Sequence, residues 1–320
     1  MAQHFLLSSK ARTLSLAQVL RLSDDEAYNH FKAIRFADNG GEPFCPKCGC
    51  VTIYEFETRK IFKCKGCQSQ FSLTSGTIFA SRKLSLRDIP SAIAIFANGA
   101  KGHSALQLSR DLDVQYKTAF VMAHKLREAM AAGDKGAKVS GEVEIDGMYT
   151  GGYVKPANHK ENRRDRRLAE NQSGKRRVVI VARERQGKTI TFVSKTEDAS
   201  VPVLHDRIAA GSTVYADEAS HWDSLHASFA TKRINHRLAY SDGEGCMNMA
   251  ESFFSRLRRA EIGTHHHIAG PYLAAYAAEM DWREDNRRMP NGEQYRAIVT
   301  AAASHPISRQ WKGYWQRRAA

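Results

Sequence analysis

Two cysteine pairs constrain the N-terminal part of this chain more than any other feature of the sequence. Cys45-Pro-Lys-Cys48 and Cys64-Lys-Gly-Cys67 are separated by fifteen residues, a spacing that is typical of a zinc ribbon. The two pairs would place four thiolates around one tetrahedral Zn²⁺, with a hairpin between them. A module this small buries little apolar surface, so the metal would be its main source of stability. Four buried or redox-active thiols are the alternative, and Cys50 competes with Cys48 for its position.

The charge of the chain indicates its class of partner. Its 320 residues suffice for two or three domains, and they carry a formal net charge of +14 with a pI near 9.6. Such a surface attracts a polyanion, and nucleic acid is the partner we expect. The basic residues of the predicted zinc ribbon favour its contact with DNA, and contact with another protein is the alternative. Apolar runs fall short of a membrane span, the first residues make a poor signal peptide, and paired cysteines suit a reducing compartment. We expect no membrane association and a cytoplasmic, nucleoid-associated protein.

Helical patterns flank the cysteine pairs on both sides. Ser23 and Glu26 form the pattern of a capping box at the start of one helix. Between residues 85 and 130 the pattern fits a helix-turn-helix, with the turn at 111–114. Residues at the start of the second helix of such a motif reach base edges in the DNA major groove; here these are Gln115, Tyr116, Lys117 and Thr118. A simple helical bundle is the alternative.

The spacing of apolar residues changes from a helical to a strand pattern beyond residue 139. Segments rich in β-branched residues alternate with helical patterns. The expected order is three strands, a helix, a strand, a short helix, a strand and a helix, which predicts a mixed five-stranded α/β sheet covered on both faces. The strands are expected at residues 142–152, 176–186, 189–196, 212–218 and 231–241, and the helices at 198–211, 221–230 and 248–263.

Three acidic residues stand at positions of this pattern where carboxylates can converge. Asp146 lies on the first strand with Glu144 on its face, Asp217 ends the fourth strand, and Glu251 lies on the last helix. Burying such carboxylates is costly unless cations or donors satisfy them. Oxygen ligands select hard cations, and two Mg²⁺ or Mn²⁺ ions would suit phosphodiester chemistry. Asn248 is the rival of Glu251 as the third ligand.

Other nearby acids are less suitable. Glu218 follows Asp217 and should point away from it. Asp242 and Glu244 lie in a segment with the composition of a turn. Between the first two strands, residues 155–177 hold nine basic residues against three acids, which is the pattern of a phosphate-binding arm. Its four central arginines are Arg163, Arg164, Arg166 and Arg167.

Four segments together carry a resemblance to a known family: VEIDGMYTGG, VYADEASHW, NMAESFFSRLRRAEIGTHHHI and MDWREDNRR. The chain resembles the fifteen-ninety-five family of bacterial insertion-sequence transposases over nearly its whole length. The resemblance implies a zinc ribbon, a helical DNA-binding region and a DDE catalytic domain of ribonuclease H-like fold. It also implies that Asp146 and Asp217 are the two catalytic aspartates, with Glu251 or Asn248 third.

The chain departs from the family pattern at two positions. Arg258 stands where the family has a lysine; it keeps the positive charge and could hold a phosphate of the transposon end. Gly147 stands where many relatives carry a second acid. The first departure preserves a positive charge at the site, and the second leaves Asp146 without an acidic neighbour.

The expected function is metal-dependent cleavage and strand transfer on double-stranded DNA, both transposon ends and target. Synapsis of two ends implies a homodimer or a larger assembly. A DNA-binding regulator that has lost catalysis and a structure-specific nuclease are the alternatives. The expected domains are an N-terminal helical segment at 1–41, a zinc ribbon at 42–78, a helix-turn-helix-like module at 79–138, a catalytic domain at 139–295 and a basic, aromatic tail at 296–320.

Overall fold

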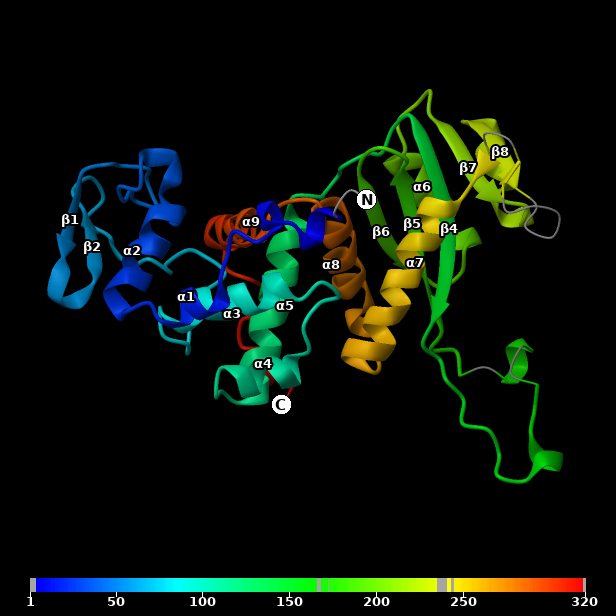
Figure 1. The fold of residues 1–320 in the computed structure, drawn as a ribbon, viewed down its shortest axis with the longest axis horizontal. Coiled ribbons are helices and arrows are strands. Elements are labelled where there is room, and N and C mark those ends of the chain that lie inside the picture. The colour runs from blue at the N-terminus through cyan, green and yellow to red at the C-terminus, as the bar shows by residue number, and fades with distance from the viewer. Residues whose placement is uncertain (1–3, 166–167, 172, 235–240, 243–244, 319–320) are drawn as a thin grey trace. The chain divides into compact units, whose positions relative to one another are not determined.

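The computed structural model describes residues 4–165, 168–171, 173–234, 241–242 and 245–318. The chain divides into two compact units. Met1–Gly133 and Asn286–Ala320 form the first, and Asp134–Asp285 form the second. The last 35 residues therefore pack with the N-terminal segments, although 152 residues of the second unit separate them in sequence. Figure 1 shows α9 (Asn291–Ser304) beside α3 (Asp88–Asn98) and α5 (Tyr116–Ala132).

A three-stranded antiparallel sheet forms the ribbon predicted around the cysteines. Strand β1 (Ile53–Phe56) pairs with β2 (Ile61–Cys64), and β2 pairs with β3 (Gln70–Phe71). Helix α2 (Asp24–Arg35) begins at Ser23, where the predicted capping box with Glu26 is formed. The buried ring of Phe36, directly after this helix, packs edge-on against Phe62 of β2, which gives the small sheet an apolar support beyond the cysteines.

The remaining helices of the first unit form a bundle. Helix α4 and helix α5 pack on each other as the two predicted helices, and the turn between them contains Asp113 in the left-handed conformation. Helix α9 packs against α2, α3 and α5. The helices are α1 (Leu16–Leu20), α3 (Asp88–Asn98), α4 (Ala105–Asp111), α5 (Tyr116–Ala132), α9 (Asn291–Ser304) and α10 (Tyr314–Arg318). Within the described ranges, we find no helix with both the length and the apolar character to cross a bilayer.

The second unit is built on the predicted mixed five-stranded sheet. Its strand order is β6-β5-β4-β7-β8. The first three strands are antiparallel neighbours, whereas β4, β7 and β8 run parallel. The strands are β4 (Glu142–Thr150), β5 (Arg177–Glu184), β6 (Thr189–Ser194), β7 (Thr213–Asp217) and β8 (Ala230–Ile234). This α/β sheet confirms the architecture expected from the change of period.

Helical segments cover both faces of this sheet. Val143, Ile145 and their neighbours pack on one face with Leu204 of α6 and with Trp222. Met148 and Val179 pack on the other face with residues of α7 and α8. The covering segments are α6 (Val201–Arg207), the 3₁₀ segment Ser220–Ala227, α7 (Asn248–Ala260) and α8 (Leu273–Asp285).

Two predicted elements differ in detail. The segment expected to be a short α-helix at 221–230 is a 3₁₀ segment, and its Trp222 and Leu225 are buried. The strand expected at 231–241 is described as β8 up to Ile234, and residues 235–240 lie outside the described part. Two short strands follow, β9 (Ser241–Asp242) and β10 (Gly245–Cys246), which pair antiparallel.

Candidate functional site

Asp146 lies on β4, the central strand of the sheet, opposite Val181 of β5. Strand alternation sends Val143 and Ile145 into the core under α6, and Glu144 and Asp146 toward the face that α7 covers. This division of the side chains is the one that the sequence predicts. Asp146 is half-buried, and its carboxylate accepts a hydrogen bond of 2.7 Å from the backbone N–H of Gly147.

Asp217 lies at the end of β7, the parallel neighbour of β4. The last paired residues are Glu144 and Tyr215, so Asp146 and Asp217 follow at the same level, two residues further along each strand. Asp217 is half-buried and accepts a hydrogen bond of 3.2 Å from the N–H of Ala219. The adjacent Glu218 is exposed, in keeping with the expectation that its side chain points away.

Glu251 lies on the first turn of α7, the helix that covers this face of the sheet, and it is exposed. Asn248 is the first residue of the same helix and is also exposed. The charge of Glu251 is close enough to Asp146 to act on its ionisation. Asp242 has no described side-chain surroundings, and Glu244 lies outside the described residues.

Three other acidic residues act on the ionisation of Asp146. Burial raises its pKa to about 7, and the negative charges of Asp217, Glu197 and Glu251 act in the same direction. Among the described residues, the four cysteines of the ribbon have ligand atoms that all lie within 4.8 Å of one another. The described carboxylates around Asp146 do not form such a compact group and are spread more widely. Two ions roughly 3.5–4 Å apart would need ligands over a region wider than a single-ion cage.

Glu197 is an acidic neighbour that the sequence analysis did not single out. It follows β6, and its carboxylate packs directly on Gly147: a Cβ at that position would lie 2.1 Å from Glu197 Oε1. Tyr149 Oη donates to Glu197 Oε2 at 3.3 Å, and His221 Nε2 lies 3.3 Å from the same oxygen. Burial raises the pKa of Glu197, and the charge of His221 opposes that rise. The one signal in the sequence was the glycine directly after Asp146.

A buried carboxylate connects the strand of Asp146 with the helix of Glu251. Glu144 is fully buried and accepts hydrogen bonds from the backbone N–H groups of Met249 (2.8 Å) and Ala250 (3.1 Å), in the first turn of α7. Its other oxygen accepts from Arg185 Nε at 3.1 Å. Glu144 therefore caps α7 and fixes it to β4, because it satisfies N–H groups that a helix leaves without partners.

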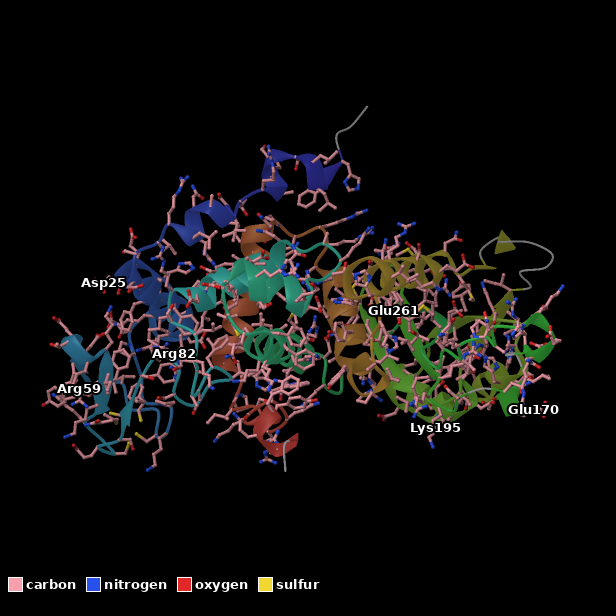
Figure 2. All side chains as sticks on the ribbon, turned by 90° about the horizontal axis from the view of Figure 1, so that it is seen from below. Asp25, Arg59, Arg82, Glu170, Lys195 and Glu261 are labelled. Carbon is pink, nitrogen blue, oxygen red and sulfur yellow. The ribbon has the colours of Figure 1, made fainter. Side chains whose placement is uncertain are left out.

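A second buried network holds the same helix to the sheet. Arg183 of β5 donates to the carbonyl oxygen of Met249 at 3.1 Å and to Glu284 of α8 at 2.6 Å. Arg256, two turns along α7, forms an ion pair with the other oxygen of Glu284, with 2.6 Å between Nε and Oε2. Beyond α7, Glu261, labelled in Figure 2, accepts hydrogen bonds from Thr150 at the end of β4. Strand and helix are thus joined at both ends of α7.

The predicted phosphate contacts lie at the periphery of this unit. Arg258 is exposed on the last turn of α7. The described parts of the basic segment between β4 and β5 extend away from the sheet (Figure 1). In it Arg164 is exposed, while Arg163 donates to the carbonyl oxygens of Ala157 and Asn158. Arg166 and Arg167 lie outside the described residues.

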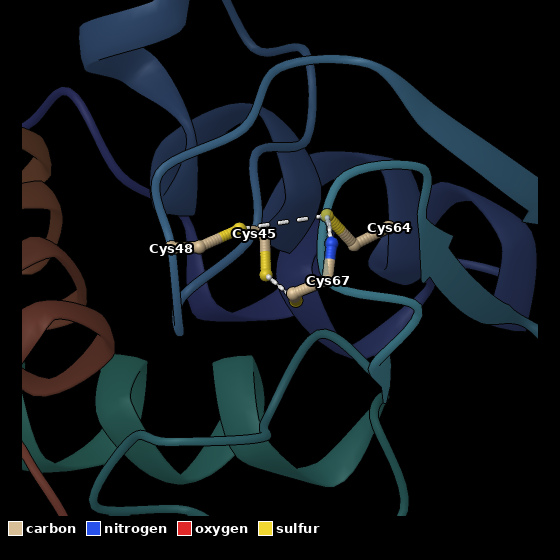
Figure 3. Close-up of side chains that lie close together, drawn as sticks. All are labelled: Cys45, Cys48, Cys64 and Cys67. Atoms are coloured by element: carbon tan, nitrogen blue, oxygen red, sulfur yellow. Dashed lines mark hydrogen bonds between the residues drawn. The ribbon is translucent and has the colours of Figure 1, made fainter.

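The four cysteines of the first unit form a cluster suited to one metal ion (Figure 3). Cys45 Sγ lies 3.6 Å from Cys67 Sγ, and Cys48 Sγ lies 3.6 Å from Cys64 Sγ. Sulfur atoms in a tetrahedral zinc site are about 3.8 Å apart, given a Zn–S bond of about 2.3 Å. Cys50 stands outside the cluster and points toward Thr52 O. The cluster thus contains Cys48 and not Cys50, which favours Cys48 as the ligand.

The residues predicted to contact base edges surround the start of α5. Gln115 is the N-cap residue and is exposed, as are Tyr116 and Lys117, while Thr118 is half-buried. The carbonyl oxygen of Lys117 accepts a hydrogen bond of 3.2 Å from the indole N–H of Trp315. Three of the four residues thus lie exposed on the surface of the first unit.

Comparison with known proteins agrees with both parts of this architecture. Residues 138–285 match the ISXO2-like transposase domain, and residues 22–70 match the transposase zinc-ribbon domain. Both domain models are of the IS1595 type, and together they cover more than half of the chain. The chain belongs to this transposase family. The resemblance seen in the sequence motifs is confirmed.

One relative extends the similarity over most of the chain. An uncharacterized protein in transposable element ISH50 of Halobacterium salinarum is 26% identical over 294 residues, which cover 88% of this chain and 97% of that protein. No solved structure matches the chain significantly.

Proposed function

We propose that this protein is a DDE transposase that binds the inverted repeats of transposon ends and catalyses metal-dependent cleavage and strand transfer. The observation that carries the proposal is the carboxyl group of Asp146. It sits on the central strand of the transposase domain, and burial and three neighbouring acids raise its pKa to about 7. A half-buried carboxyl group with several acidic neighbours indicates a site that is completed by cations. The strand order β6-β5-β4-β7-β8 supports a ribonuclease H-like fold.

The donor set fits Mg²⁺ or Mn²⁺, because it consists of carboxylate oxygens without thiols. Asp146, Asp217 and Glu251 would hold the ions. Two bound ions would supply an activated water or 3′-hydroxyl and a stabilised leaving oxygen. Glu251 is preferred over Asn248 as the third ligand, since a carboxylate binds a cation more strongly than an amide, and since its charge already acts on Asp146.

The protein's own residues would orient the DNA and the acids. Glu144 positions the first turn of α7, and with it Glu251, relative to Asp146. Arg258, on the last turn of the same helix, would hold a phosphate of the transposon end through its fork of donors. The basic segment, with Arg163, Arg164, Arg166 and Arg167, would neutralise further phosphates.

The first unit would supply recognition of the ends. Cys45, Cys48, Cys64 and Cys67 would hold one structural Zn²⁺, and the start of α5, with Gln115, Tyr116, Lys117 and Thr118, would read base edges. We propose a ribbon at 42–78, a helix-turn-helix-like module at 79–138 and a basic, aromatic tail at 296–320. The catalytic domain expected at 139–295 is proposed to end at 285 instead, because residues 286–320 pack with the first unit. A homodimer or larger assembly would synapse two ends, acting on nucleoid DNA in the cytoplasm.

The test is a cleavage and joining assay with the full chain, terminal-repeat DNA of its element and Mg²⁺. We expect the wild type to cut at the repeat ends and join them to a target plasmid, and Asp146→Asn to lose both activities. Binding of the ends without cutting would favour the regulator. Cutting without joining and without preference for the ends would favour the nuclease. Either result would overturn the proposal.

A further inference from the structure

A cavity of about 660 Å³ lies within the first unit, and the function proposed above assigns no ligand to it. Its walls come from the loop Phe79–Leu84, the first three turns of α5 and the C-terminal segment Trp311–Gln316. Pockets that take small organic molecules have volumes of roughly 300–1,000 Å³. The cavity is therefore large enough for a ligand of the size of a nucleotide.

The charge of the lining selects an anionic ligand. The described lining residues include five cationic side chains and no Asp or Glu. The cations are Arg82, Lys83, Lys117, Lys125 and Lys312. Arg82, labelled in Figure 2, enters from the loop before α3, and the lysines come from all three wall segments. A site of this kind concentrates phosphate groups.

Among these cations, Lys125 has the surroundings that most directly indicate an anionic ligand. It lies on α5, half-buried, and forms no ion pair with any residue that the structure describes. Burial lowers the pKa of its ammonium group, and the charge of Glu128 only partly opposes this. An anion in the cavity would compensate the lost solvation of Lys125.

The C-terminal segment adds an aromatic surface to the same cavity. Trp311 is only 2% exposed and stacks on His124 with ring centroids 4.2 Å apart, which anchors the segment to α5. Trp315 is half-buried and lines the cavity. Its indole N–H is held by Lys117 O, and its ring stands nearly perpendicular to that of Tyr314. The ring of Trp315 is thus held in place by these contacts.

The cavity adjoins the part of α5 expected to meet DNA. Gln115, Lys117 and Thr118 belong both to the cavity wall and to the predicted base-contacting residues. A ligand that combines a phosphate with a flat ring, and that arrives with DNA, is a nucleotide that has left its base pair. Stacking on an aromatic side chain repays much of the cost of extruding a base.

We propose that this cavity binds one unpaired nucleotide of the transposon end, with its base against Trp315 and its phosphate near Lys125. The site rests on the proposed function for the source of the nucleotide. Stacking accepts any base, because every base has a π-face. The cavity would therefore detect that the end of a duplex is open, independently of the sequence read by α5.

The test compares two DNA probes on the full-length, zinc-loaded protein. One is a blunt duplex, and the other is the same duplex with a single unpaired 2-aminopurine nucleotide at its end. We expect the wild type to bind the second probe about 10-fold more tightly and to quench its fluorescence. Trp315→Ala should abolish both the preference and the quenching, Trp315→Phe should retain most of each, and Lys125→Met should reduce the preference.

Lys101→Met provides a matched control, because Lys101 is an exposed lysine of the same unit outside the cavity. It should weaken both probes equally or not at all. Equal binding of the two probes by the wild type, or an undiminished preference in Trp315→Ala, would overturn the proposal. Either outcome differs from a failure of the proposed function alone. In that case the wild type would still prefer the open end but would neither cut nor join DNA.

Discussion

Replacing Glu144 by glutamine tests how the strand of Asp146 is joined to the helix of Glu251. The carboxylate is fully buried and accepts hydrogen bonds on one oxygen from two N–H groups of α7 and on the other from Arg185. A glutamine amide has one accepting oxygen, so either Arg185 or the helix must face an NH₂ group. Hydrogen bonds to charged groups contribute about 1.5–3 kcal/mol each. We expect Glu144→Gln to lower the free energy of unfolding by about 2–4 kcal/mol, and Glu144→Ala to lower it by about 3–5 kcal/mol.

Urea unfolding of the full chain measures this loss when the transition of the second unit is monitored. Glu142→Gln is the matched control: this acid lies on the same strand and near the same arginine, but its side chain is 53% exposed, so we expect a loss of about 1 kcal/mol or less. A double-mutant cycle with Arg185→Met isolates the coupling across the pair. If Glu144→Gln unfolds at the urea concentration of the wild type, the carboxylate does not hold the helix.

Three further predictions concern other parts of the molecule. Cys64→Ser should release the bound zinc and unfold the ribbon, whereas Cys50→Ser should retain it; metal analysis and circular dichroism measure both, and equal zinc content in the two variants would contradict the assignment. Gly147→Ala should displace the Glu197 carboxylate and reduce DNA joining as much as Glu197→Ala does, with no further loss in the double variant; additive losses would refute the contact. Burial raises the pKa of Asp281 well above its ordinary value. The stability that the neutral carboxyl group contributes is therefore fully present below the ordinary pKa and is lost as pH rises from there through the raised pKa. Asp281→Asn should remove this decline of the free energy of unfolding with pH, and an unchanged profile would contradict this.

Local signals in the sequence predicted the elements that they encode directly. The cysteine spacing predicted the ribbon, the serine and glutamate at residues 23 and 26 predicted a helix start, and strand alternation predicted the face of Asp146. Each of these depends on residues that are close in sequence. The spacing alone left Cys50 in competition with Cys48, because a difference of two residues is within the tolerance of the motif.

Contacts between distant residues were beyond such reasoning. Glu197 reaches Gly147 across fifty residues, and nothing in its own segment distinguishes it from a surface acid. Glu144 was visible only as an acid on the face of Asp146, since its partners lie on a helix more than a hundred residues away. The return of residues 286–320 to the first unit likewise follows from tertiary packing, which local patterns do not encode.

Joining of a pre-cut transposon end to target DNA tests the central claim most directly, because it requires the metal site but not prior cleavage. Asp217→Asn and Glu218→Gln form a matched pair: adjacent acids, the first half-buried beside Asp146 and the second exposed. We predict that Asp217→Asn abolishes Mg²⁺-dependent joining while it still binds the end, and that Glu218→Gln joins at the rate of the wild type. Joining by Asp217→Asn at an undiminished rate would contradict the assignment of these acids as the catalytic centre.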